Sequence, residues 1–141
     1  MNQEKINFKD YMAHEPPMLF VDKVLEKSEK KAKTSFTVNK ECIFLDESGV
    51  LARSALIEIA GQSFAAADIL KKTMKGGKKD LKGFLVSVRD FKFIHDARAG
   101  DEIICDTEET NNIAQLRIVE AKLSVNGICI ACGELRVFDK P

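Results

Sequence analysis

The sequence predicts an α+β fold in which one long central helix is wrapped by a curved antiparallel β-sheet. Residues 50–72 are apolar or small almost all the way round, which is typical of a buried helix and not of a surface helix. Residues 83–138 instead form apolar segments separated by turn residues, which is typical of a β-meander. One helix and one sheet share a single core, so we expect one domain over residues 1–141.

The elements before the central helix are short. Residues 5–13 predict an N-terminal helix, which Pro16 and Pro17 end because proline cannot continue a helix interior. Residues 19–25 are mostly apolar and residues 32–38 alternate, so both segments predict strands. The charged residues between the two strands predict a solvated turn.

The sheet continues after the helix with three or four antiparallel strands. Phe91 and Phe93 fall out of phase with the preceding apolar residues, which predicts a β-bulge near Asp90. Asn126-Gly127 is the strongest hairpin signal in the chain, because both central positions of a type I′ turn need positive φ. Another turn is expected at Asn111-Asn112. The predicted strand segments are residues 83–94, 102–109, 113–125 and 128–138.

Composition and charge exclude several classes of protein. Lysine plus arginine and aspartate plus glutamate both number 22, so no net charge favours nucleic acid as a partner. No apolar run reaches the roughly 20 residues needed to span a bilayer, and the N-terminus lacks the apolar core of a signal peptide. We therefore expect a cytoplasmic protein that binds neither nucleic acid nor membrane. Nothing in the sequence predicts a cofactor or a metal site.

The four cysteines are expected to be reduced residues of the fold. Cys129 and Cys132 form a C-x-x-C motif, but no second pair completes a zinc-binding set. The motif lies in a predicted strand, where an odd offset sends two side chains to opposite faces. We therefore interpret both cysteines of the motif as structural.

A narrow polar line interrupts the central helix. Ser54, Glu58 and Gln62 lie four residues apart, so they stack on one face. A glutamate within an apolar helix is costly unless it is paired, protonated or used in chemistry. We expect burial to raise the pKa of Glu58, so that it holds a proton near neutral pH. The alternative for Glu58 is a structural carboxylate that bridges two subunits. The alternative for Ser54 is a helix cap, which is the usual role of a serine at a helix start.

Four stretches of the sequence resemble the 3-hydroxyacyl-[acyl-carrier-protein] dehydratases of fatty-acid and polyene synthesis. They are HEPPMLFVDKVLE at 14–26, ALIEIAGQSFAA at 55–66, GFLVSVRDFKFIHDARAGDEI at 83–103 and AKLSVNGICIACGEL at 121–135. Their order and spacing span nearly the whole chain. The resemblance implies the hot-dog fold, which is one central helix wrapped by a curved antiparallel sheet. It also implies a lyase that removes water from hydroxyacyl thioesters.

The sequence departs from this family at a catalytic position. The family carries a G-H-F-P motif whose histidine is the catalytic base, and counting back fourteen residues from the helix acid reaches Phe44. Ser54 stands where the family usually has glycine. The pattern from Gly49 to Glu58 is more similar to a divergent branch of the family that is associated with aryl-polyene gene clusters.

The resemblance also implies roles for the site residues. Glu58 would be the general acid, and Gln62 would position it or line the pocket. Backbone N–H groups near Ser54 would bind the thioester oxygen at the helix start. His14 is the natural substitute for the missing base, with a structural role as an equal alternative. His95, at a strand end, is expected to be a solvated residue at the rim.

Three functions remain open from the sequence. The first is a dehydratase acting on 3-hydroxyacyl chains carried by an acyl carrier protein. The second, which the missing histidine favours, is a non-catalytic hot-dog subunit that pairs with an active paralogue. The third is an acyl thioesterase, because thioesterases of this fold also place a carboxylate on the central helix.

Assembly follows from the expected fold. One sheet cannot bury a helix on both sides, so we expect a homodimer or a larger even oligomer, or a heterodimer with a paralogue. Six lysines lie between Lys71 and Lys82. This run is expected to form a solvated loop or, alternatively, a basic patch for an acidic carrier protein.

Overall fold

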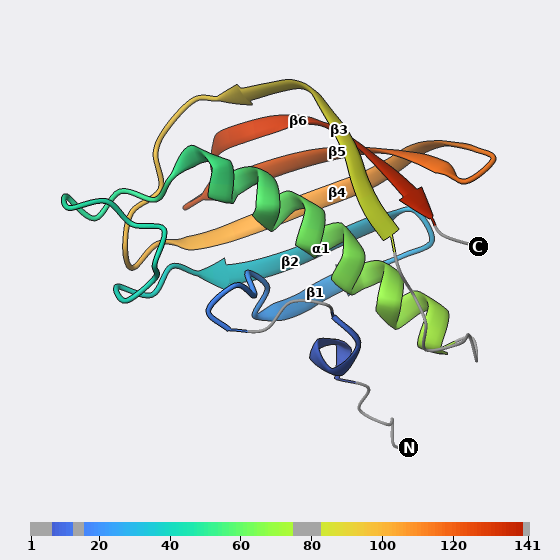
Figure 1. Cartoon of the computed structure of the whole chain (residues 1–141), viewed down its shortest axis with the longest axis horizontal. Coiled ribbons are helices and arrows are strands. Elements are labelled where there is room, and N and C mark those ends of the chain that lie inside the picture. Colours follow the sequence, from blue (N-terminus) through green and yellow to red (C-terminus); the bar gives the residue numbers. More distant parts are fainter. Residues whose placement is uncertain (1–6, 13–15, 75–82, 140–141) are drawn as a thin grey trace.

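The structure is a computed structural model that describes residues 7–12, 16–74 and 83–139. One long helix lies against one six-stranded antiparallel sheet, as predicted (Figure 1). The elements are, in chain order, the 3₁₀ helix η1 (Phe8–Tyr11), β1 (Lys23–Lys27), β2 (Lys31–Thr37), α1 (Arg53–Met74), β3 (Gly83–Phe93), β4 (Glu102–Ile113), β5 (Leu116–Val125) and β6 (Ile128–Asp139). Neither helix in these ranges combines the length and the apolar character that a membrane crossing requires.

The strands follow the order β1-β2-β4-β5-β6-β3 across the sheet. Every neighbouring pair is antiparallel. β1 and β3 therefore form the two edges of the sheet. Figure 1 shows α1 running along one face, with the strands curving around it.

The core lies between α1 and the sheet face that the helix covers. Alternation along each strand decides which side chains enter this core. On β5, Val119 and Leu123 are buried, whereas Glu120 and Lys122 are exposed. The helix contributes small and apolar side chains to the same cluster, namely Ala55, Leu56, Ile59, Ala60 and Phe64. The packing of this helix face onto the inner sheet face is the main apolar contact of the fold.

One face of α1 is not covered by the chain's own sheet. Ser54 and Glu58 are exposed, and Ile57, Gly61 and Ala65 are half-buried. These residues recur at intervals of three and four, so they form one continuous line, the open stripe, along the helix. In the single chain the helix is therefore buried on one side, in agreement with the expectation that one sheet cannot bury a helix on both sides.

Two strand ends differ from the sequence prediction. β1 begins at Lys23, four residues later than predicted. β4 continues to Ile113, so the turn before β5 lies at Ala114-Gln115 and not at Asn111-Asn112. A register shift after Glu109 accompanies this longer strand, and both asparagines pair with residues of β5. Asparagine is a turn signal only where the chain turns, and here the sheet ladder continues through it.

Two other local predictions are confirmed. Asn126 and Gly127 have φ angles of 53° and 79° in the turn between β5 and β6. The ladder between β3 and β6 shifts register between Arg89 and Lys92, and Asp90 has a φ of 51°. The bulge thus lies where the apolar phase of the sequence changes.

The prediction that Cys129 and Cys132 point to opposite faces of their strand is wrong. Cys132 pairs with Lys122, and Cys129 pairs with Ser124, which is two residues further along β5. Residues two apart on a strand share a face, so the two cysteines share that face as well. An extra residue, Ile130, forms a β-bulge in β6 and changes the alternation.

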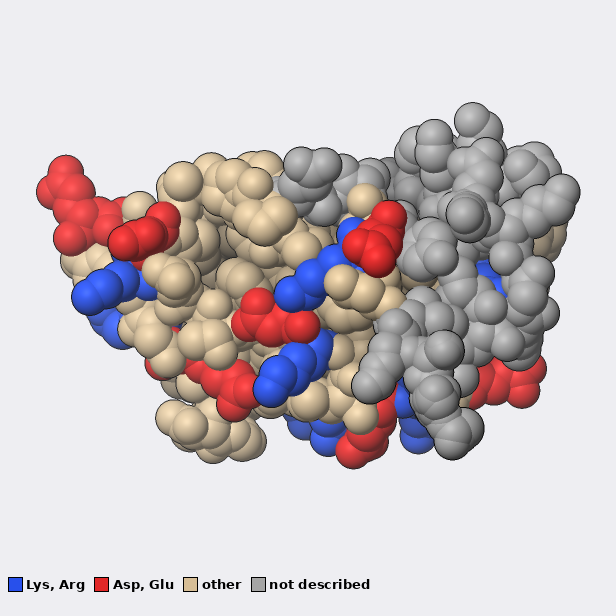
Figure 2. All heavy atoms as spheres, turned by 90° about the horizontal axis from the view of Figure 1, so that it is seen from below, with Lys and Arg blue, Asp and Glu red and all other residues tan. Residues whose placement is uncertain are grey.

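Charged side chains of both signs share the molecular surface. Acidic and basic groups interleave over the middle of the face shown in Figure 2, in keeping with the equal totals of 22 in the sequence. Because neither sign of charge dominates this face, the candidate functional groups are individual polar side chains and not a charged patch.

Candidate active site

Gln62 is the most firmly anchored member of the predicted polar line. It is 2% exposed. Its Oε1 accepts a hydrogen bond from the N–H of Phe20 at 2.6 Å, and its Nε2 donates to the carbonyl of Met18 at 2.9 Å. The same Nε2 donates to Oε1 of Glu58 at 3.3 Å. Because a buried amide is stable only with its polar atoms paired, these bonds fix Gln62, and Gln62 in turn orients the carboxylate.

Glu58 accepts a hydrogen bond from Gln62 and is at the same time exposed to solvent. Its side chain is exposed on the open stripe, one turn before Gln62. The prediction that the helix itself desolvates this carboxyl is wrong for the single chain, because that side of α1 faces away from the sheet. Ser54 is also exposed, in the first turn of α1, where backbone N–H groups lack partners within the helix. The structure therefore brings Glu58 and Gln62 together and leaves Ser54 beside them on the surface.

The start of α1 borders an open pocket. Phe44, which stands where the resembled family has its histidine, packs edge-on against Phe20 with 5.5 Å between ring centroids. Phe44 also lines the pocket, which has a volume of about 470 Å³ and includes Leu45 and Val50. The position that counting back from Glu58 predicts for the family's histidine thus carries an aromatic ring that cannot transfer a proton.

Of the two histidines in the chain, His95 lies within the described residues and His14 does not. His14 lies outside the described residues, so its role as the substitute base stays a prediction. His95 follows β3 and is exposed, which confirms its predicted position. Its backbone N–H donates to the carbonyl of Ile130 at 3.2 Å.

A second polar group on α1, in the other half of the helix, was not predicted from the sequence. Arg117 of β5 is 6% exposed, and its two terminal nitrogens bind Asp68 at 3.0 and 2.8 Å. Its Nε and Nη2 also bind Oε1 of Glu109 on β4, at 3.2 and 2.8 Å. The guanidinium lies 4.7 Å from the ring centroid of Phe64. This charged cluster ties the helix to two strands of the sheet.

The charges of this cluster compensate one another. Burial alone would raise the pKa of Asp68, but the hydrogen bond and the charge of Arg117, with a further contribution from Lys72, hold that pKa below its ordinary value.

Alternation along β5 is the sequence signal that could have revealed Arg117, because Arg117 falls in phase with the buried Val119. That signal predicts an inward arginine, but it does not say which acids the arginine meets.

The fold and the site together define a class of protein. One long helix carries an oriented carboxylate in its first half, and a six-stranded antiparallel sheet wraps the helix. This is the hot-dog arrangement of the acyl-thioester dehydratases that the sequence resembles.

Comparison with known families makes the assignment specific. The family model of the ApeP-like proteins, described as ApeP dehydratase, matches residues 6–141, so the chain belongs to this family. The 3-hydroxyacyl-[acyl-carrier-protein] dehydratase FabZ of Streptococcus suis is 30% identical over 141 residues, which cover 92% of this chain and 93% of the relative. The protein of the same name from Streptococcus sanguinis is 28% identical over 133 residues, 92% of each chain. The predicted dehydratase family and its divergent aryl-polyene branch are confirmed.

Solved structures agree on the fold. A chain of the dehydratase heterocomplex ApeI:P from Xenorhabdus doucetiae superposes with a TM-score of 0.87 at 18% identity, over 98% of this chain and 93% of the other. The PaaI protein of the phenylacetic acid degradation operon of E. coli superposes with a TM-score of 0.67 at 14% identity, over 82% and 81% of the two chains. At these identities the likeness concerns the fold, and it confirms the predicted hot-dog architecture.

Proposed function

We propose that this chain takes part in removing water from 3-hydroxyacyl groups carried by an acyl carrier protein, in fatty-acid or polyene synthesis. The FabZ relatives carry this activity in their names. The observation that carries the proposal is the Glu58 carboxylate, which the buried Gln62 holds while the glutamate remains exposed. A carboxyl that is oriented and accessible is suited to deliver a proton to a substrate.

The reaction needs a base and an acid. The base takes a proton from the carbon next to the thioester carbonyl, and the acid protonates the hydroxyl that leaves as water. In this proposal Glu58 is the acid, Gln62 positions it, and His14 is the candidate base. Backbone N–H groups near Arg53 and Ser54, at the start of α1, stabilise the negative charge that develops on the thioester oxygen.

A second subunit completes the site in this proposal. The open stripe carries small residues at Gly61 and Ala65, which let another chain approach the helix closely. β3 lies at an edge of the sheet, where its outer backbone groups can pair with a partner strand. A partner on the stripe would cover Glu58 and supply the desolvation that the single chain lacks. The ApeI:P neighbour is described as a heterocomplex, which supports a paralogue as the partner.

Two alternatives differ in what this chain contributes. The first alternative is a non-catalytic subunit. It is favoured because the predicted position of the catalytic histidine carries Phe44, so the paralogue would supply that histidine. A thioesterase has weaker support: a hypothetical thioesterase from Streptococcus pneumoniae, solved with coenzyme A, shares the fold at 10% identity and a TM-score of 0.68. A likeness at that identity carries the fold and not the reaction.

Mass spectrometry of the substrate separates these functions. The chain is incubated with a 3-hydroxyacyl group on an acyl carrier protein, first alone and then with its hot-dog paralogue. Loss of water that a Glu58→Gln variant abolishes supports the proposal. Release of the carrier thiol assigns a thioesterase, and dehydration that needs the paralogue but not Glu58 assigns a non-catalytic subunit.

Assembly is tested on the open stripe. A Cβ at Gly61 would meet no atom within 4 Å, so we expect the single chain to fold with Gly61→Leu and the larger side chain to obstruct a partner. Sedimentation is expected to show a dimer or a larger even oligomer for the wild type, and a monomer for this variant. Glu120→Leu, on the sheet face away from α1, is the matched control and should assemble normally. A wild type that stays monomeric, alone and with the paralogue, contradicts the assembly.

That the lysine run binds an acidic carrier protein stays a prediction. Lys71 donates to a backbone carbonyl of the β1–β2 turn at 2.8 Å, and Lys72 pairs with an acid of the helix at 3.0 Å, so both have partners within the chain. Lys75, Lys78 and Lys79 lie outside the described residues. Reversing these three charges should lower turnover of carrier-bound substrate and spare a small thioester if they bind the carrier. Equal effects on both substrates assign them to a solvated loop.

A further inference from the structure

The C-x-x-C motif of β6 has a geometry that its sequence does not predict. The bulge at Ile130 places Cys129 and Cys132 on the same face of the sheet, the face away from α1. The inward positions of this stretch are taken by Ile130 and Ala131, which are both buried. The bulge therefore brings together two thiols that an unbroken strand would separate.

The two thiols are close to each other. Cys132 lies near enough to Cys129 to raise the pKa of its thiol, and the Sγ of Cys129 donates to the carbonyl of Ala131 at 3.6 Å. Both cysteines are free and half-buried. Partial burial, and then the neighbouring Cys132, raise the pKa of Cys129, so Cys129 ionises less readily than an ordinary thiol.

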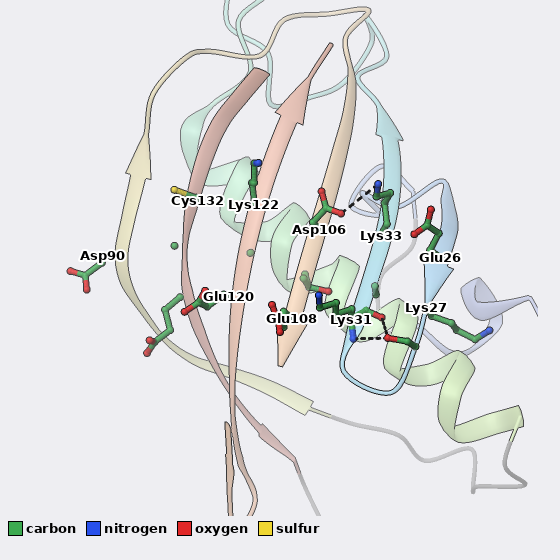
Figure 3. Close-up of a pocket in the computed structure, with 16 residues that line it drawn as sticks. Glu26, Lys27, Lys31, Lys33, Asp90, Asp106, Glu108, Glu120, Lys122 and Cys132 are labelled. Carbon is green, nitrogen blue, oxygen red and sulfur yellow. Dashed lines mark hydrogen bonds and ion pairs between the residues drawn. The ribbon is translucent and has the colours of Figure 1, made fainter. Parts of the chain in front are cut away.

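The surroundings of Cys132 make it accessible to a reagent. It lines an open groove of about 800 Å³ across the outer sheet face. Figure 3 shows Cys132 of β6 beside Lys122 of β5, its partner in the ladder. Lys92 of β3 is its partner on the other side. Cys132 thus lies between two lysines, whose positive charges attract anionic reagents such as a glutathione disulfide.

The other cysteines have different environments. Cys105 is 1% exposed on the inner face of β4, and burial raises its pKa to about 12. Cys42 is half-buried in the loop before α1 and packs against the main core. A buried thiol of high pKa is unreactive, so the pair on β6 is where thiol chemistry is expected.

We propose that Cys129 and Cys132, the sheet dithiol, form a reversible redox modification site that converts to an intramolecular disulfide by exchange with a small disulfide of the glutathione type. The thiolate of Cys132 attacks one sulfur of the small disulfide and releases one thiolate. Cys129 then loses its proton to solvent and attacks the sulfur of Cys132, which releases the second thiolate. The two protein thiols are oxidised and the one small disulfide is reduced, so atoms and electrons balance.

The site has a structural consequence at the edge of the sheet. The carbonyl of Ile130 accepts the N–H of Ile94 at 2.7 Å and that of His95 at 3.2 Å. Ile130 lies inside the short loop that the disulfide closes. Oxidation therefore acts on the residue that anchors the end of β3 to β6. This inference does not rest on the proposed dehydratase function.

The experiment uses the full chain, reduced and then treated with glutathione disulfide. Remaining thiols are alkylated and the protein is analysed by intact mass and by peptide mapping. The wild type is expected to lose two alkylatable thiols, to retain no glutathione and to yield a peptide that joins Cys129 to Cys132. A reducing dithiol should restore both thiols.

Single variants test the order of the steps. Cys129→Ser lacks the second thiol, so it should keep glutathione on Cys132. Cys132→Ser lacks the attacking thiol, so it should acquire glutathione on Cys129 more slowly. Cys42→Ser is the matched control and should behave as the wild type. A wild type that keeps glutathione on either cysteine of the pair, or that joins Cys42 or a second chain instead, overturns the proposal. Equal rates for Cys129→Ser and Cys132→Ser overturn the assigned order.

Discussion

Helix α1 carries two acids that the protein treats in opposite ways. Asp68, in the second half, is mostly buried and is held by the cations of Arg117 and Lys72. Glu58, in the first half, is exposed and is held by the neutral amide of Gln62. Neighbouring cations keep an acid charged, so Asp68 serves the fold. The amide of Gln62 carries no charge, and it orients the Glu58 carboxylate through a hydrogen bond.

An acid in an apolar helix can therefore serve the fold or face a partner, and the apolar residues around it do not say which. Both acids interrupt the same apolar stretch, and either one is costly there without compensation. The compensation for Asp68 comes from buried cationic contacts, whereas Glu58 lies on the exposed open stripe, where a partner or a substrate can reach it. Four predictions test this contrast, beginning with the largest expected effect.

Removing the acid function of Glu58 should have the largest effect. Glu58→Gln keeps the shape of the side chain but cannot donate a proton in the same way, so turnover should fall about 10²–10⁴-fold. The free energy of unfolding should change little, because the side chain is exposed. Steady-state kinetics and urea unfolding measure the two effects. His14→Ala should lose a comparable amount of activity if His14 is the base.

The same replacement at the other acid is the control for this contrast. Asp68→Asn should lower stability more than Glu58→Gln does and lower turnover less. If both variants lose activity in proportion to their loss of stability, the two acids have the same role and the contrast fails.

Removing the cation of the second half should mainly affect stability. Arg117→Met leaves Asp68 and Glu109 near each other without their shared partner, which should lower the free energy of unfolding by about 3–5 kcal/mol. Lys33→Met is the control, since Lys33 pairs with Asp106 at 3.8 Å on a much more exposed face and should cost less than about 1 kcal/mol. If Arg117→Met and Lys33→Met lose the same free energy of unfolding in urea, burial of the Arg117 cluster does not add to the stability of the fold.

Removing the amide of Gln62 should affect both stability and turnover. Gln62→Leu leaves the N–H of Phe20 and the carbonyl of Met18 without this partner, at a cost of about 1–3 kcal/mol. Glu58 also loses its support, so kcat should fall further than stability explains. Thr34→Val removes another buried hydrogen bond, to Ser63 at 2.7 Å, and is the matched control. If both variants lose kcat equally, Gln62 has no positioning role.

The smallest effect is expected in the pH dependence of stability. The pKa of Asp68 is lowered in the folded protein, so below the ordinary aspartate value of about 3.9 the unfolded chain binds more protons than the folded chain. The stabilisation from Asp68 is complete above that value and is lost as the pH falls through the lowered folded pKa. Unfolding measured across this acidic range should show a slope that Asp68→Asn reduces. An unchanged slope in Asp68→Asn would remove Asp68 from the acid response.

Features that depend only on neighbouring residues could be predicted from the sequence. Asn126-Gly127 makes its turn because positive φ is a property of those two residues. The bulge at Asp90 follows from a change of phase that is visible along one strand. The bond between Glu58 and Gln62 follows from their spacing of one helical turn. These outcomes need no knowledge of what the rest of the chain does.

Which surfaces are covered and which distant groups meet depends on how the whole chain packs, so the sequence patterns did not predict it. Glu58 is exposed because the sheet covers the opposite side of α1, and no local pattern says which side that is. Arg117 meets Asp68 because the fold brings β5 into contact with the second half of the helix. Cys129 and Cys132 share a face because β6 must bulge to stay in register with β5. Burial and pairing depend on contacts between segments far apart in the chain, and the periodicity of a single segment does not contain them.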